Sequence, residues 1–327
     1  MKKTQLLTIF LFCATPFIAN AKVWRVNNNP GIQADFTTPQ AAQNAAAPGD
    51  TLHIEPSSIN YGNLVLSKPL TIISIGNYLT GNPGLEAAPV TGTMQNLTVN
   101  AGASGSVLSC NFSGTTNISS VNKIRFERSY LTGDVTCVSA DSIVILDCSC
   151  AGQIILQTNS NNILIANTFI GYILNMQNTC SATVTNNILG FGNTTYANSA
   201  VNVYNCTFEN NIIKNGQNYT FTNSTVTNNI TSGTAASLPN TNNNQIGVNM
   251  VNVFVNPTGS NDDDFILVNG SLASGVGVNG VDDGVFGGAT PYKPAMQAAI
   301  PAIYKLTAPS TVVGNTLNII FSTRSNN

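Results

Sequence analysis

Apolar and polar residues alternate along much of this chain, and the alternation recurs in a longer repeat. One residue separates Ile143 from Ile145 and Ile163 from Ile165, which is the period of a half-buried strand. β-Branched residues and Asn dominate, and no 3.6-residue period is sustained, so the pattern favours strands over helices. Glycine recurs every 19 residues, at Gly114, Gly133, Gly152, Gly171 and Gly190. A repeat of this length is typical of a solenoid.

Like residues fall at like positions when each coil is counted from the residue after its glycine. Position 17 holds Leu131, Cys150, Phe169 and Ile188, and position 15 holds Ser129, Cys148, Asn167 and Asn186. In stacked coils, equal positions lie about 4.8 Å apart. Aliphatic columns would therefore form the core, and Asn columns would hydrogen-bond along the stack. We predict an all-β solenoid with coils of about 19 residues, each containing three short strands.

The two ends of the solenoid differ from its coils. Thr37 or Thr38 is placed to cap a short Ala-rich helix with Pro39 in its first turn. Such a helix would plug the first coil, whose open end otherwise exposes apolar surface and unpaired backbone. Residues 76–93 are rich in Gly and Pro and indicate a loop that leaves the wall of the solenoid.

These end segments carry a family resemblance. The capping helix, the Gly-Asp-Thr turn and strands at 64–66 and 70–73 resemble the start of secreted bacterial proteins of the pectin-lyase-like superfamily. The closing segment matches at Asp264-Phe265-x-Leu267, Ser271, Asp282-Asp283-Gly284, Phe286-Gly287-Gly288 and Pro291-Tyr292. The resemblance implies a right-handed parallel β-helix and export. It implies no particular activity, because members share a scaffold and not a common site.

Three segments are expected. Residues 1–21 are typical of a signal peptide, with Lys2 and Lys3 before an apolar stretch and cleavage after Ala21. Residues 22–292 form the β-helix with its cap. Residues 293–327 form a C-terminal tail, with strands at 303–306 and 317–321, packed on the end or side of the helix. The protein would reach the periplasm, the cell surface or the medium.

Composition narrows the classes of function. Only 8% of the residues are charged and the formal net charge is −2, so no basic stripe exists to bind nucleic acid. No apolar run after residue 21 approaches the ~20 residues of a membrane span. Six cysteines follow Cys13, and Cys148 and Cys150 share the inward period, which favours buried free thiols over disulfides.

The densest charge cluster spans one coil and part of the next. It contains Lys123, Arg125, Glu127, Arg128, Asp134, Asp141 and Asp147. Arg128 and Asp147 share position 14, so we expect an ion pair between coils. A solvated face held by this pair is the favoured interpretation.

The resemblance adds a catalytic alternative. Polysaccharide lyases of this fold use carboxylates to hold calcium and a Lys or Arg to abstract a proton. In this chain Asp134, Asp147 and Glu127 would supply calcium ligands, and Arg125 or Lys123 would be the base. Glu127 has no acidic residue at its own position in neighbouring coils, so the calcium triplet is incomplete.

Two classes of function remain open. The first is a noncatalytic secreted β-helix that presents a long face to a glycan or another cell-surface partner. The second is a polysaccharide-degrading enzyme, a calcium-dependent lyase before a glycoside hydrolase, in which Arg128 and Asp141 would bind substrate. Sparse charge and the lack of an acidic groove favour the first class. Calcium is a cofactor only of the lyase alternative, and the oligomeric state is left open.

Overall fold

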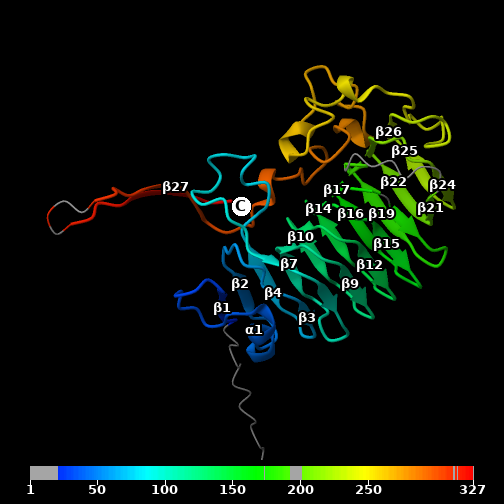
Figure 1. Cartoon of the computed structure of the whole chain (residues 1–327). Coiled ribbons are helices and arrows are strands. Elements are labelled where there is room, and N and C mark those ends of the chain that lie inside the picture. The colour runs from blue at the N-terminus through cyan, green and yellow to red at the C-terminus, as the bar shows by residue number, and fades with distance from the viewer. Residues whose placement is uncertain (1–20, 173, 192–200, 312–313, 315, 327) are drawn as a thin grey trace, which may run out of the picture.

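The computed structural model describes residues 21–326, except 173, 192–200, 312–313 and 315. Its body is a right-handed parallel β-helix of about nine turns, which confirms the predicted fold class (Figure 1). Most coils contribute one strand to each of three parallel sheets, here called sheets A, B and C. The described residues contain no helix long and apolar enough to cross a membrane.

The strands of each sheet stack in chain order. Sheet A contains β1 (Val23–Val26), β2 (Thr51–Ile54), β4 (Thr71–Ser74), β7 (Val107–Ser109), β10 (Arg125–Glu127), β13 (Val144–Leu146), β16 (Ile163–Ala166), β19 (Ala182–Thr185), β22 (Cys206–Glu209) and β25 (Thr225–Thr227). Sheet B contains β3 (Leu64–Leu66), β6 (Leu97–Val99), β9 (Thr116–Ser119), β12 (Val135–Val138), β15 (Ile154–Gln157) and β18 (Leu174–Met176), and the pair β21 (Val201–Tyr204) and β24 (Tyr219–Thr222) continues it beside β18. Sheet C contains β5 (Thr93–Met94), β8 (Asn111–Phe112), β11 (Tyr130–Leu131), β14 (Ser149–Cys150), β17 (Phe169–Ile170), β20 (Ile188–Leu189), β23 (Ile212–Ile213) and β26 (Ile230–Thr231).

Inward side chains form apolar columns along the inside of the helix. In sheet A, Phe126 stacks between Leu108 and Ile145, and all three are fully buried. Each such side chain contributes about 1.5–3 kcal/mol by leaving water. The six described cysteines are buried with free thiols, several of them in these columns, as the sequence predicted.

One column differs from the prediction. Val138 pairs with Gln157, 19 residues on, whereas Asp141 bridges to Asn161, 20 residues on. The turn after β15 therefore holds one extra residue, and Cys150 stacks on Ile170 rather than on Phe169. Assigning Phe169 to the Cys150 column was wrong because the extra residue shifts every later position by one relative to the 19-residue count, and neighbouring positions of a strand face opposite sides.

Phe169 instead belongs to a second core outside the helix. It is fully buried against Tyr292 and Phe265, at ring-centroid distances of 4.9 and 5.8 Å. Both partners lie in the chain that returns after β26 and covers sheet C (Figure 1). This returning chain contains the 3₁₀ helices η1 (Met250–Asn252), η2 (Asp262–Phe265), η3 (Val278–Gly280) and η4 (Pro294–Met296).

The N-terminal cap follows the prediction. Helix α1 (Pro39–Ala45) begins after Thr38, whose Oγ1 accepts a hydrogen bond from the N–H of Ala41 over 3.3 Å. Pro39 occupies the first turn, where its missing N–H costs nothing. Asp50 then ties the turn to β1 by accepting from the indole N–H of Trp24 over 2.8 Å.

An Asn ladder runs through the turns between sheets A and C. The sequence predicted such a column of hydrogen-bonded Asn side chains, although with different members. The Nδ2 groups of Asn187, Asn211 and Asn229 each donate to the Oδ1 of the next member, the last being Asn244, over 2.9, 3.0 and 2.9 Å. The ladder uses Asn187 rather than the expected Asn186 because of the shifted column. Its members are almost fully buried, so each amide depends on its neighbours for hydrogen bonds.

The C-terminal tail forms an antiparallel hairpin of β27 (Ala302–Thr307) and β28 (Ile320–Arg324). The hairpin projects away from the solenoid (Figure 1), and Leu306 and Phe321 are 57% and 60% exposed. The expectation that both strands pack on the helix was therefore wrong. The base of the hairpin contacts the body, for example through the N–H of Ala87, which donates to the carbonyl of Ile303 over 2.8 Å.

Candidate functional site

A groove of about 520 Å³ lies on the outer face of sheet A. Its floor is formed by outward side chains of β10, β13, β16, β19 and β22, and residues 278–290 of the returning chain form its wall. Arg125, a residue of the predicted charge cluster, stands at its β10 end. A smaller groove, of about 140 Å³, contains Glu127 and Arg128 of the same cluster. We therefore take the larger groove as the candidate site.

The floor of the groove changes from charged to apolar to hydroxyl-bearing along the stack. Arg125 lines one end, the aliphatic side chains of Leu146, Leu164 and Ala166 line the middle, and Thr185 and Glu209 line the far end. Leu164 and Thr185 are partly exposed because the alternation that buries Phe126 turns every second side chain outward, whereas Leu146 and Ala166 are only 6% and 5% exposed.

Arg125 is paired within its own strand. Its Nε donates to the Oε2 of Glu127 over 2.8 Å, and both side chains are partly exposed. A guanidinium has donors only, so Arg125 as placed is suited to hold an anionic group. The sequence predicted Arg125 as a base and Glu127 as a calcium ligand. The structure brings these two side chains together, and they form an ion pair with each other.

The carboxylate at the far end of the groove was missed from the sequence. Glu209 lies in the same row as Glu127, with Leu146, Ala166 and Thr185 between them. Four strand spacings separate the two glutamates, or about 19 Å. Paired carboxylates of glycoside hydrolases lie about 5–9.5 Å apart. Glu127 and Glu209 are therefore ends of a long surface and are too far apart to act as such a pair.

The wall of the groove is held by a second set of Asn residues. Asn167 donates to the carbonyls of Val285 and Gly287 over 2.8 and 2.7 Å, and Asn186 donates to the carbonyl of Asp282 over 2.9 Å. The two Asn residues have φ of 48° and 54°, a left-handed conformation that Asn tolerates. Gly287 is required here, because a Cβ would lie 1.8 Å from the carbonyl oxygen of Asp282.

Arg128 and Asp147 are buried under the returning chain, so the prediction of a solvated face is wrong for both. They do occupy equivalent positions of successive coils, but they form no ion pair among the described residues. The Nη1 of Arg128 donates instead to the carbonyls of Gln297 and Asn326 over 3.1 and 3.0 Å. Burial raises the pKa of Asp147 to about 7, against the opposing charge of Arg128.

The remaining predicted residues lie at turns away from the groove. Asp134 accepts from the N–H of Gln153 over 2.9 Å at the start of sheet B. Asp141 accepts from the Ser142 hydroxyl and the Asn162 amide over 2.7 and 2.8 Å. Lys123 is exposed in the turn before β10, with its N–H bonded to the carbonyl of Asp141.

The proposed calcium ligands are therefore dispersed. Glu127 ends a strand of sheet A, Asp147 is buried in the following turn of the next coil, and Asp134 precedes β12 of sheet B. In the described part of the chain, no group of three or more His, Cys, Asp or Glu side chains is placed to hold a metal ion.

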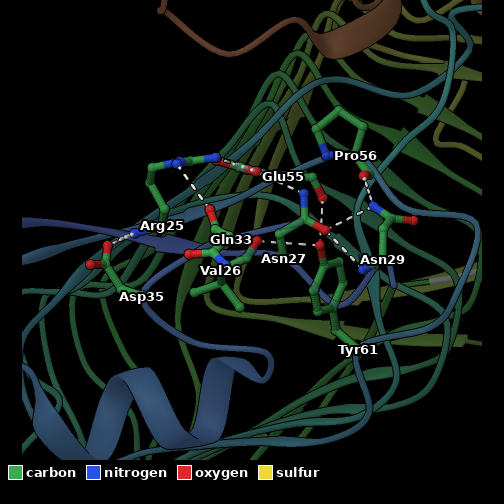
Figure 2. Close-up of polar contacts among 9 residues, drawn as sticks. All are labelled: Arg25, Val26, Asn27, Asn29, Gln33, Asp35, Glu55, Pro56 and Tyr61. Carbon is green, nitrogen blue, oxygen red and sulfur yellow. Dashed lines mark hydrogen bonds and ion pairs between the residues drawn. The ribbon is translucent and has the colours of Figure 1, made fainter. Parts of the chain in front are cut away.

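A second charged cluster at the first coils of sheet A is satisfied internally. Figure 2 shows Arg25 in an ion pair with Glu55, whose Oε2 also accepts from Asn27 over 2.7 Å. Burial acts to raise the pKa of Glu55, but the hydrogen bonds from Arg25 and Asn27 outweigh it and lower the pKa below its usual value. Tyr61 closes the network by donating to the carbonyls of Val26 and Glu55. This network fixes the first coil beside the cap.

Comparison with known proteins adds no assignment: no protein-family model and no curated protein matches the chain.

Proposed function

We propose that this protein is an exported, noncatalytic β-helix of the pectin-lyase-like superfamily that binds an extended glycan along the groove of sheet A. The N-terminal leader pattern supports export to the periplasm, cell surface or medium. The capping helix, the Gly-Asp-Thr turn and the closing segment support the relationship to the superfamily.

One observation carries the proposal of binding. The groove extends over five coils, with Arg125 at one end and Glu209 at the other, four strand spacings or about 19 Å apart. Its floor between them carries aliphatic side chains and the hydroxyl of Thr185. An open, elongated surface of this kind offers apolar patches to sugar rings and hydrogen bonds to their hydroxyls. Arg125 would interact with a carboxylate or sulfate of an acidic glycan at one end.

Affinity electrophoresis in gels containing polygalacturonate, alginate or a neutral glucan tests this proposal. Wild-type protein should be retarded by at least one polymer, and Leu164→Asn, in the middle of the floor, should reduce the retardation. Ile155→Asn is the matched control, because Ile155 is also partly exposed but faces outward from sheet B. Loss of retardation in both variants, or no retardation of wild type by any polymer, would contradict the proposal.

The same polymers test the lyase alternative. A noncatalytic protein forms no unsaturated sugar product, with or without added calcium. Calcium-dependent product formation that disappears in Arg125→Ala would instead place the protein among polysaccharide lyases.

A further inference from the structure

A separate cavity of about 270 Å³ lies where β28 returns to the solenoid. Three segments form it: the loop 76–92 through Leu85, the η4 segment through Lys293 and Gln297, and the end of the chain through Arg324 and Asn326. The cavity shares no lining residue with the groove of sheet A. It is thus a second concave site, built by segments distant in sequence.

The lining is cationic. Lys293 and Arg324 contribute to it, and none of the lining residues is acidic. Residues 293–327 contain no Asp or Glu at all, although three residues, Lys293, Lys305 and Arg324, are basic. An anion entering this cavity would therefore meet positive charge on two of its walls.

The guanidinium of Arg324 is held in place by hydrogen bonds from one of its nitrogens. Its Nη2 donates to the Oε1 of Gln297 over 2.8 Å and to the carbonyl of Leu85 over 3.3 Å, which holds the side chain in place. Its Nε is buried and has no hydrogen-bond acceptor. Because this Nε is inaccessible to solvent, it does not face the cavity, and Arg324 contributes to the lining through its other atoms.

A second guanidinium stands behind the same wall. Arg128 is 8% exposed and binds the carbonyls of Gln297 and Asn326, while its Nε is also buried without an acceptor. Two carboxyl groups lie near the three cations Lys293, Arg324 and Arg128: Glu86 accepts from the Nε2 of Gln297 over 3.3 Å, and Asp147 lies beside Arg128, where burial raises its pKa to about 7. Positive charge therefore exceeds negative charge around the cavity.

We propose that this cavity binds one oxyanion group: a carboxylate, sulfate or phosphate, either free or as the acidic substituent of a sugar. A guanidinium beside an ammonium forms charge-assisted hydrogen bonds to such groups. The volume suits a small anion or a single sugar unit. The site is independent of the glycan-binding groove.

Isothermal titration of the full chain tests the proposal, using sodium sulfate, sodium phosphate, sodium galacturonate and neutral galactose at constant ionic strength. Wild type should bind at least one of the three anions and not galactose. Arg324→Gln should weaken that binding by about tenfold or more, because a hydrogen bond to a charged group is lost. Binding of sulfate or phosphate alone identifies a free anion, and tighter binding of galacturonate identifies an acidic sugar.

Lys305→Gln is the matched control, because it removes the same charge from β27 outside the cavity. It should leave the affinity unchanged, as should Leu164→Asn in the groove. Circular dichroism checks folding, and Lys293→Gln, at an exposed position of the cavity rim, replaces Arg324→Gln if that variant unfolds. Absence of anion binding by wild type, or an equal loss in Lys305→Gln, would overturn the proposal.

Discussion

Arg128 and Asp147 lie at the same position of successive coils, yet they do not satisfy each other. The guanidinium donates to carbonyls of the returning chain, and the Oδ1 of Asp147 is buried without a hydrogen bond. Both residues have positive φ, 55° and 53°, like the Asn residues at this turn in later coils. The arrangement makes a buried carboxyl group, rather than a surface ion pair, the electrostatic feature of this coil.

This buried carboxyl group predicts a pH dependence of stability. Because the pKa of Asp147 is raised to about 7 in the folded protein, the folded state keeps a proton that the unfolded chain loses above about pH 4. The stability contributed by this group therefore falls as pH rises from about 4 to 7, and the full cost is present above pH 7.

Asp147→Asn should remove this cost, and Asn suits the left-handed backbone, as Asn167 shows one coil on. We expect a gain of about 1–4 kcal/mol at pH 8 and little change at pH 4, measured by urea denaturation. Asp141→Asn, at a partly exposed turn, serves as the control for removing a carboxyl group and should change stability at pH 8 by less than about 0.5 kcal/mol. A destabilisation by Asp147→Asn at pH 8 would contradict the argument.

The Asn ladder predicts a large effect from a single amide. Asn211 accepts from the N–H and the Nδ2 of Asn187 and donates to the carbonyl of Val184. Asn211→Ala leaves these buried groups unsatisfied, so we expect a loss of about 2–4 kcal/mol in denaturant unfolding. Asn117→Ala, at an exposed position of β9, should change stability by less than about 0.5 kcal/mol. Similar losses in both variants would argue against the ladder.

The second core predicts that one ring holds the returning chain on sheet C. Phe169→Ala should cost about 3–5 kcal/mol, because it opens a cavity against Tyr292 and Phe265. Limited proteolysis should then cut residues 250–296 first, since their packing depends on this ring while the coils retain their own core. In Ile170→Ala, which truncates an inward side chain, we expect no such preference. If the protease cuts the coils of Phe169→Ala first, the packing of the returning chain does not depend on Phe169.

The free thiols predict a difference between folded and unfolded protein. Burial raises the pKa of Cys137, Cys148 and Cys206 to about 12, so little thiolate is available for alkylation. Iodoacetamide should leave the native protein unmodified. In denaturant without reductant it should label all six cysteines that the structure describes, from Cys110 to Cys206, as counted by mass spectrometry. Two or more native disulfides, detected as unlabelled pairs, would contradict this prediction.

The features that the sequence alone determined are local or strictly periodic. Alternation around Ile143 and Ile145 predicts strands, the glycine repeat predicts stacked coils, and Thr38 with Pro39 predicts the cap. Each depends on residues within one coil or on their repetition, so a reader of the chain needs no tertiary contact to infer it. The existence of an Asn ladder could also be predicted, because stacking brings equal positions of successive coils together.

Only the tertiary structure decided which residues occupy each face after residue 157. One additional residue in the turn after β15 places Phe169 outside the inner core. It also gives the two residues of each consecutive Asn-Asn pair different functions. Asn186 holds the returning chain, whereas Asn187 joins the ladder. A turn insertion has no hydrophobic signature of its own, so the glycine period concealed it.

Tertiary structure also decided the groove and the cavity. The groove wall at 278–290 and the carbonyls that bind Arg128 lie far along the chain from the coils they contact. No local pattern encodes that return, and Arg128, Asp147 and Glu209 therefore read as ordinary surface charges in the sequence. Their burial or alignment follows from long-range packing of the returning chain on the stacked coils.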